Sequence, residues 1–81
     1  KEREFICTNF QRMNIKYWES DANYIFFMHK KRLKEELLKR GILIRDCSNY
    51  KNLTDGYYRI AIKSRKDNVK LIDALADIDI N

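Results

Sequence analysis

The sequence predicts an α+β fold, in which a small, mostly antiparallel sheet carries helices packed on one face. Segments with helical periodicity and short apolar or aromatic runs follow one another in the order helix, strand, strand, helix, strand, strand, helix. The 81 residues, 44% of them hydrophobic, suffice for one domain with one modest core. Because the chain has only two glycines and no proline, it contains no glycine-rich phosphate loop.

The chain opens with a predicted helix. Ile6, Phe10 and Met13 recur at helical spacing and indicate a helix over residues 2–12. This helix lacks an N-terminal capping signal. We therefore expect residues 1–12 to be the tail of a helix from a preceding region, and residues 13–81 to form the domain itself.

Two strands and a second helix are predicted next. Alternation indicates a short strand at residues 15–18, and the apolar run at residues 24–28 is typical of a strand covered on both faces. Residues 31–40 then form a helix whose leucines point inward and whose lysines point outward. Gly41 ends this helix, because glycine readily takes the left-handed conformation that a C-cap needs.

The remaining elements are two strands and a helix. Residues 42–44 restart as a strand, and the polar stretch 48–56 is a loop. Residues 57–62 show the clearest strand pattern of the chain, with Tyr58, Ile60 and Ile62 on one face and Arg59 on the other.

The last helix begins at a Ser-x-x-Asp capping box formed by Ser64 and Asp67. Its predicted buried stripe consists of Val69, Ile72, Leu75 and Ala76.

The formal charge of +5 allows two interpretations. Residues 30–40 carry six basic and two acidic side chains, which could form a nucleic-acid-binding patch. We favour the solvated face of an amphipathic helix. The basic stretch lacks interleaved aromatic residues, and the sheet lacks a recognisable exposed aromatic pair for stacking bases. We expect neither nucleic acid nor a membrane as partner, since no apolar run approaches the roughly 20 residues of a membrane span.

The sequence offers no catalytic or metal-binding constellation. Cys7 and Cys47 are too few and too far apart for a disulfide scaffold or a zinc site, so we expect two reduced thiols in a cytoplasmic protein. His29 follows an apolar run and precedes lysines, and we expect it at the surface. We predict no catalytic residue and no metal ligand in this chain.

Arg59 is the strongest candidate for binding a ligand. A mid-strand arginine is costly to desolvate unless it meets an anion, and its planar fork suits a carboxylate or a phosphate. The alternative is an ordinary arginine on the solvent face of the sheet, and the pattern alone favours neither. Arg45, which ends the neighbouring predicted strand, could converge with Arg59 on a doubly charged ligand.

Several motifs resemble a known family. They are A-N-Y at residues 22–24, G-I-L-I-R at 41–45, C-S-N-Y-x-x-L at 47–53, Y-Y-R-I-A-I-K-S at 57–64 and N-x-x-L-I-x-A-L at 68–75. Together they resemble the C-terminal small domain of pyridoxal-phosphate enzymes of the aspartate-aminotransferase fold. Within that superfamily the chain is similar to the histidinol-phosphate aminotransferases, and most closely to the threonine-phosphate decarboxylases of cobalamin biosynthesis.

This resemblance implies a two-layer small domain and roles for three residues. Arg59 would bind the substrate α-carboxylate, Arg45 would contact the phosphate end of an amino acid phosphate, and Asn23 would lie near the substrate entrance. The family's Schiff-base lysine, its aspartate for the pyridine nitrogen and its phosphate cup belong to the large domain. We therefore expect the 81 residues alone to bind no pyridoxal 5'-phosphate and to be inactive, and the full-length enzyme to be a homodimer.

Overall fold

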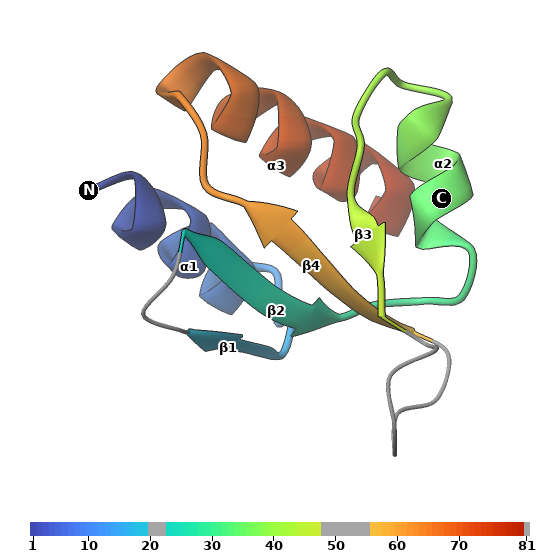
Figure 1. Ribbon diagram of the computed structural model, residues 1–81, viewed down its shortest axis with the longest axis horizontal. Helices are drawn as coiled ribbons and strands as arrows, with labels where there is room; N and C mark the ends of the chain where they lie inside the picture. Colours follow the sequence, from blue (N-terminus) through green and yellow to red (C-terminus); the bar gives the residue numbers. More distant parts are fainter. Residues whose placement is uncertain (20–22, 48–55, 81) are drawn as a thin grey trace.

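The computed structural model describes residues 1–19, 23–47 and 56–80, and confirms the predicted α+β class. The elements are α1 (Glu2–Arg12), β1 (Tyr17–Glu19), β2 (Tyr24–Met28), α2 (Leu33–Leu38), β3 (Arg45–Asp46), β4 (Tyr57–Ala61) and α3 (Arg65–Ile80). Among the described residues, four strands form one antiparallel sheet in the order β1-β2-β4-β3. In Figure 1, α1 and α3 lie behind this sheet and α2 lies to the side of β3.

The core lies between the sheet and the helices. Helix α1 contributes Ile6 and Phe10, both fully buried, as predicted from their spacing. The origin of α1 in a preceding region stays a prediction. From the sheet, Ile25 and Phe27 on β2 and Tyr58 on β4 complete the centre of the core.

Helix α2 is shorter than predicted. Arg32 has a φ of 66°, a left-handed conformation that separates residues 31 and 32 from the helix beginning at Leu33. At the other end, Gly41 has a φ of 78° and confirms the predicted stop. The Ile42 amide donates to the Leu37 carbonyl at 2.9 Å, which is the long hydrogen bond of a Schellman motif.

The predicted strand at residues 42–44 is wrong, because β3 comprises only Arg45 and Asp46. Ile44 is buried and packs into the core, whereas Leu43 is 70% exposed. Their apolar side chains gave the segment a strand-like pattern, but only residues 45 and 46 lie in register with β4.

Strand β2 is covered on one face only, which corrects the expectation of two covered faces. Ile25 and Phe27 are buried against the helices, but Tyr24 remains 39% exposed on the opposite face. Strand β1 also lies slightly later than predicted, at residues 17–19.

Helix α3 begins as predicted, but its buried stripe differs. The Asp67 amide donates to the Ser64 hydroxyl at 3.4 Å, which confirms the cap. Ile72 and Leu75 are buried as expected. Val69 and Ala76 are exposed, because the core-facing side is shifted around the helix toward Leu71, Ala74 and Ile78.

Candidate functional site

The two arginines singled out by the sequence lie directly opposite each other. Arg45 on β3 pairs with Arg59 on β4 in the antiparallel register, so both side chains leave the same face of the sheet. This is the open face, opposite the helices. Directly paired residues have Cβ atoms about 4.5–5.5 Å apart. The sheet therefore brings together two guanidinium groups that are fourteen positions apart in the sequence.

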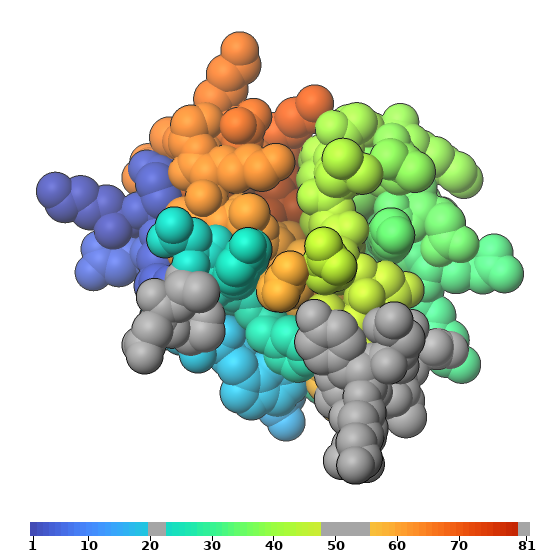
Figure 2. Space-filling view, viewed as in Figure 1, coloured from blue at the N-terminus to red at the C-terminus, as the bar shows by residue number. Residues whose placement is uncertain are grey.

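The arginine pair lines an open hollow of about 510 Å³. Figure 2 views this face, and its surface is hollowed between the orange β4 side and the yellow-green β3 side. Lys34 of α2 and Lys63, which follows β4, also line the hollow, whereas Asp46 is the acidic residue of its lining. The charge balance of the lining is therefore strongly positive and suits an anionic ligand.

Neither arginine of the pair is neutralised by a carboxylate of the described residues. Among the described residues, Arg45 and Arg59 form no ion pair. The guanidinium carbon of Arg59 instead lies 4.2 Å from the centroid of the Tyr24 ring, within the range of a cation–π contact. The N–H donors of both arginines thus have no competing protein carboxylate among those residues.

Asn23 lies next to this site but does not line the hollow. It precedes β2, is exposed, and its backbone carbonyl accepts a hydrogen bond from the Ile62 amide at 2.9 Å. Its role at a substrate entrance stays a prediction. The C-S-N-Y-x-x-L motif lies outside the described residues from position 48 onward.

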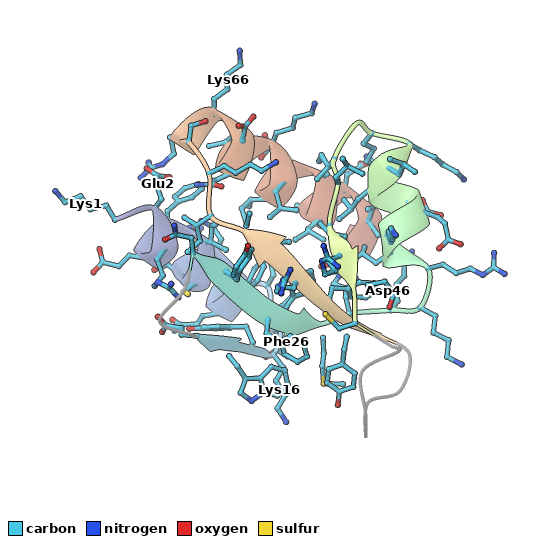
Figure 3. The ribbon with its side chains drawn as sticks, in the orientation of Figure 1. Lys1, Glu2, Lys16, Phe26, Asp46 and Lys66 are labelled. Atoms are coloured by element: carbon cyan, nitrogen blue, oxygen red, sulfur yellow. The ribbon has the colours of Figure 1, made fainter. Side chains whose placement is uncertain are left out.

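An aromatic row continues from the arginines across the open face. Phe26 pairs with Arg59 on one side and with Trp18 on the other, and the Phe26 ring stacks on Tyr57 at 5.7 Å between centroids. Lys16 lies over the Trp18 ring, and in Figure 3 Phe26 and Lys16 mark the part of the sheet near β1. Our premise that the sheet lacks an exposed aromatic pair is therefore wrong. Alternation alone did not reveal which strands are neighbours.

The side chain of His29 is largely buried, which corrects its predicted surface position. Its side chain is 8% exposed, and Nε2 lies 2.9 Å from the Asp79 carboxylate on α3. Its Nδ1 atom is buried and has no hydrogen-bond partner within the described part of the chain. Asp79 is fifty positions away in sequence, so no local pattern could have predicted this contact.

The two thiols are buried and are not joined in a disulfide. Burial raises the pKa of the Cys7 thiol. Within residues 1–19, 23–47 and 56–80 no group of three or more His, Cys, Asp or Glu could hold a metal ion. No helix in the same ranges is long and apolar enough to cross a membrane.

The comparisons with known proteins identify the family of this open-faced domain. A histidinol-phosphate aminotransferase of Methanocella arvoryzae is 33% identical over 81 residues, which cover 95% of this chain and 22% of the relative. The threonine-phosphate decarboxylase of Salmonella typhimurium is 40% identical over 60 residues, which cover 70% of this chain and 16% of the relative. The crystal structure of the histidinol-phosphate aminotransferase from Clostridium acetobutylicum superposes with a TM-score of 0.89 at 30% identity, covering 99% of this chain and 26% of that one.

The chain belongs to the class I/II aminotransferase superfamily. These relatives are pyridoxal-phosphate enzymes, and the chain spans about a quarter of their length or less. No family model matches it.

The described residues do not fit the cofactor itself. Pyridoxal-phosphate enzymes hold the cofactor through an enclosed lysine that forms a Schiff base. Every lysine in the described part of this superfamily member is exposed.

Proposed function

We propose that this chain is the substrate-anion-binding part of a pyridoxal-phosphate-dependent enzyme, similar to threonine-phosphate decarboxylase, that acts on an amino acid phosphate. The observation that carries the proposal is the direct pairing of Arg45 with Arg59 on an open, positively lined hollow. The 40% identity to a threonine-phosphate decarboxylase supports this choice of substrate.

In this proposal each arginine binds one of the two anionic groups of the same substrate. Arg59 binds the α-carboxylate with its planar fork, and Arg45 contacts the phosphate. Holding both ends fixes the orientation of the bonds around the α-carbon, which must be set before one of them is cleaved. Lys34 and Lys63 add positive charge around the hollow and raise the local concentration of a doubly charged substrate.

A histidinol-phosphate aminotransferase is the alternative within the same superfamily. It is supported by the TM-score of 0.89 to such an enzyme and by the 33% identity over 81 residues. Its substrate, as named, has a phosphate but no carboxylate. Binding selectivity between these two phosphate esters therefore separates the two proposals, because only threonine phosphate carries a carboxylate for Arg59.

The binding experiment uses the 81-residue chain and its arginine signals in NMR. Titration with threonine phosphate and with histidinol phosphate gives two dissociation constants. We expect threonine phosphate to bind more tightly, and Arg59→Gln to weaken it by about 10- to 100-fold, the range for a charged hydrogen bond. Lys63→Gln removes the same charge from the same hollow and serves as the matched control.

Two results would contradict this proposal. Equal losses in Arg59→Gln and Lys63→Gln would indicate general electrostatic attraction instead of a specific carboxylate contact. Tighter binding of histidinol phosphate would favour the aminotransferase. In the complete enzyme, release of carbon dioxide from threonine phosphate then distinguishes decarboxylation from amino-group transfer.

The cofactor belongs to the rest of the enzyme in this proposal. We expect the 81-residue chain, mixed with pyridoxal 5'-phosphate and threonine phosphate, to release no carbon dioxide and to retain no cofactor after gel filtration. Retained cofactor would contradict this expectation. We further propose that the complete enzyme is a homodimer.

The aromatic row favours one candidate function of a different kind, a surface that stacks nucleic-acid bases. Trp18, Phe26 and Tyr57 form a partly exposed platform beside two arginines, a combination that single strands use. A salt titration with a generic single-stranded oligonucleotide tests it. Binding that falls steeply with rising salt supports this candidate, and an absence of binding at low salt rejects it.

A further inference from the structure

Tyr24 and Arg59 form a stacked pair at the rim of the hollow. Tyr24 is the first residue of β2 and pairs with Ala61, while Arg59 pairs with Phe26 two positions further along β2. The two are thus diagonal neighbours on the open face, within reach of a long side chain and an aromatic ring. The separation of 4.2 Å between guanidinium carbon and ring centroid lies well inside the cation–π range of about 6 Å.

Stacking restrains a guanidinium without using its hydrogen-bond donors. A guanidinium carbon 4.2 Å over a ring centroid is within stacking distance. In a stacked arrangement the five N–H groups, which lie in the guanidinium plane, point away from the ring. An aspartate or glutamate partner would instead occupy the N–H edge and cancel the charge. Arg59 has no such partner among the described residues, so its N–H edge is open to a ligand.

Arg45 makes this restraint necessary. It faces Arg59 directly across the β3–β4 pair, and like charges in that position repel each other. Without a restraint, repulsion and the rotamer freedom of arginine would move the Arg59 side chain away from the shared hollow. The Tyr24 ring opposes both effects because it attracts the cation and limits its rotamers.

We propose that Tyr24 is a positioning residue for the anion site, which stacks on Arg59 and holds its N–H edge open to a carboxylate or phosphate oxyanion. This inference rests on the proposed function, because it takes the arginine pair to be the anion site. It goes beyond that function because it gives a neutral side chain, Tyr24, the role of orienting Arg59 for anion binding.

The experiment titrates the 81-residue chain with inorganic phosphate at constant ionic strength, and follows the arginine Nε–Hε signals by NMR. Tyr24→Phe keeps the ring and should bind phosphate as the wild type does. Tyr24→Ile keeps a strand-forming side chain but removes the ring, and should weaken binding by about two- to fivefold. Arg59→Gln leaves Arg45 in the hollow but removes the other guanidinium, and should weaken binding more than Tyr24→Ile does.

The pattern of results separates the two proposals. Weaker binding in Arg59→Gln with unchanged affinity in Tyr24→Ile overturns the role of Tyr24 and leaves the arginine site standing. Unchanged binding in Arg59→Gln, or no response in the wild type, overturns both. A lower melting temperature of Tyr24→Ile with unchanged affinity indicates a structural role only, and also overturns the inference.

A second measurement does not depend on any variant folding. The ring current of Tyr24 should move the Arg59 side-chain protons of the wild type upfield, because they lie over the ring face. Arg59 signals at ordinary positions would show that the stack is absent in solution, and would overturn the proposal.

Discussion

The side-chain amide of Asn68 brackets the backbone of Lys63, because it forms hydrogen bonds with both the N–H and the carbonyl of that residue. The Lys63 amide donates to Asn68 Oδ1 at 3.2 Å, and Asn68 Nδ2 donates to the Lys63 carbonyl at 2.9 Å. Asn68 is 2% exposed and its Nδ2 also donates to Glu2 at 3.0 Å. One buried residue on α3 therefore fixes both the chain leaving β4 and the start of α1, and thereby the end of the strand that carries Arg59.

Replacing Asn68 should destabilise the domain. Asn68→Ala removes three hydrogen bonds of a buried side chain, and we expect a loss of about 1–3 kcal/mol in the free energy of unfolding. Urea unfolding followed by circular dichroism measures the loss. Asn9→Ala is the matched control, because Asn9 makes a single local bond to the Phe5 carbonyl within α1. Equal effects of the two substitutions would contradict the bracketing role.

The stability of the domain should depend on the ionisation of Glu2. Hydrogen bonds from Arg65 and Asn68 hold the pKa of the Glu2 carboxyl below its ordinary value. Because the folded pKa is lowered, the stabilisation is fully present above the unfolded pKa and is lost as pH falls through the folded pKa. Figure 3 shows Glu2 between the start of α1 and the start of α3.

The test compares wild type and Glu2→Gln across the acid range. Their difference in unfolding free energy should be constant above pH 6, and should shrink below the ordinary glutamate pKa of about 4.3. Glu4→Gln, on the same helix, is the control, since Glu4 forms no ion pair with another described residue. A difference that grows as the pH falls would contradict the assignment.

The two glycines should tolerate alanine to different degrees, although both have positive φ angles. A Cβ at Gly56 would lie 2.7 Å from the His29 carbonyl oxygen, which belongs to the backbone and cannot rotate away. At Gly41 the nearest atom is the flexible Lys70 Nζ, at 3.5 Å. We expect Gly41→Ala to cost about 1–2 kcal/mol and Gly56→Ala about 2–5 kcal/mol. Thermal or urea unfolding would refute this if Gly41→Ala were the more damaging.

The arginine pair should cost stability when no anion is bound. Arg45→Gln removes the repulsion with Arg59, and we expect it to raise the free energy of unfolding by about 0.2–1 kcal/mol. The gain should decrease with added salt, because salt screens exposed charges. Arg40→Gln is the control and should lower the free energy of unfolding, since Arg40 forms an ion pair with the Asp77 carboxylate at 2.7 Å. A destabilised Arg45→Gln variant would show that Arg45 contributes to the fold instead.

Sequence patterns predicted correctly those elements that are determined by residues close together in the chain. The stop at Gly41 and the cap at Ser64 depend on residues within one helical turn, and the alternation of Tyr58, Arg59 and Ile60 placed Arg59 on the face opposite the core. The fold class followed from the order of such elements. The proximity of Arg45 and Arg59 was anticipated, but their direct pairing required the register of β3 against β4.

The contacts that sequence reasoning missed join distant segments. The Tyr58 hydroxyl donates to the Lys30 carbonyl and accepts from the Leu33 amide, which fixes the start of α2 against β4. The cross-strand stack of Tyr24 on Arg59 depends in the same way on which strands are neighbours. The shift of the α3 stripe away from Val69 depends on the angle at which the helix crosses the sheet. None of these relations leaves a periodic signal in the sequence.

The open aromatic row also contains an intrinsic fluorescence probe. Trp18 is the only tryptophan of the chain, and its side chain is 40% exposed on the face that carries the arginine pair. Its fluorescence therefore reports the polarity of that face. A macromolecule that covers the face would shift the emission toward shorter wavelengths, whereas a small anion held at the distant β3 edge would leave it nearly unchanged.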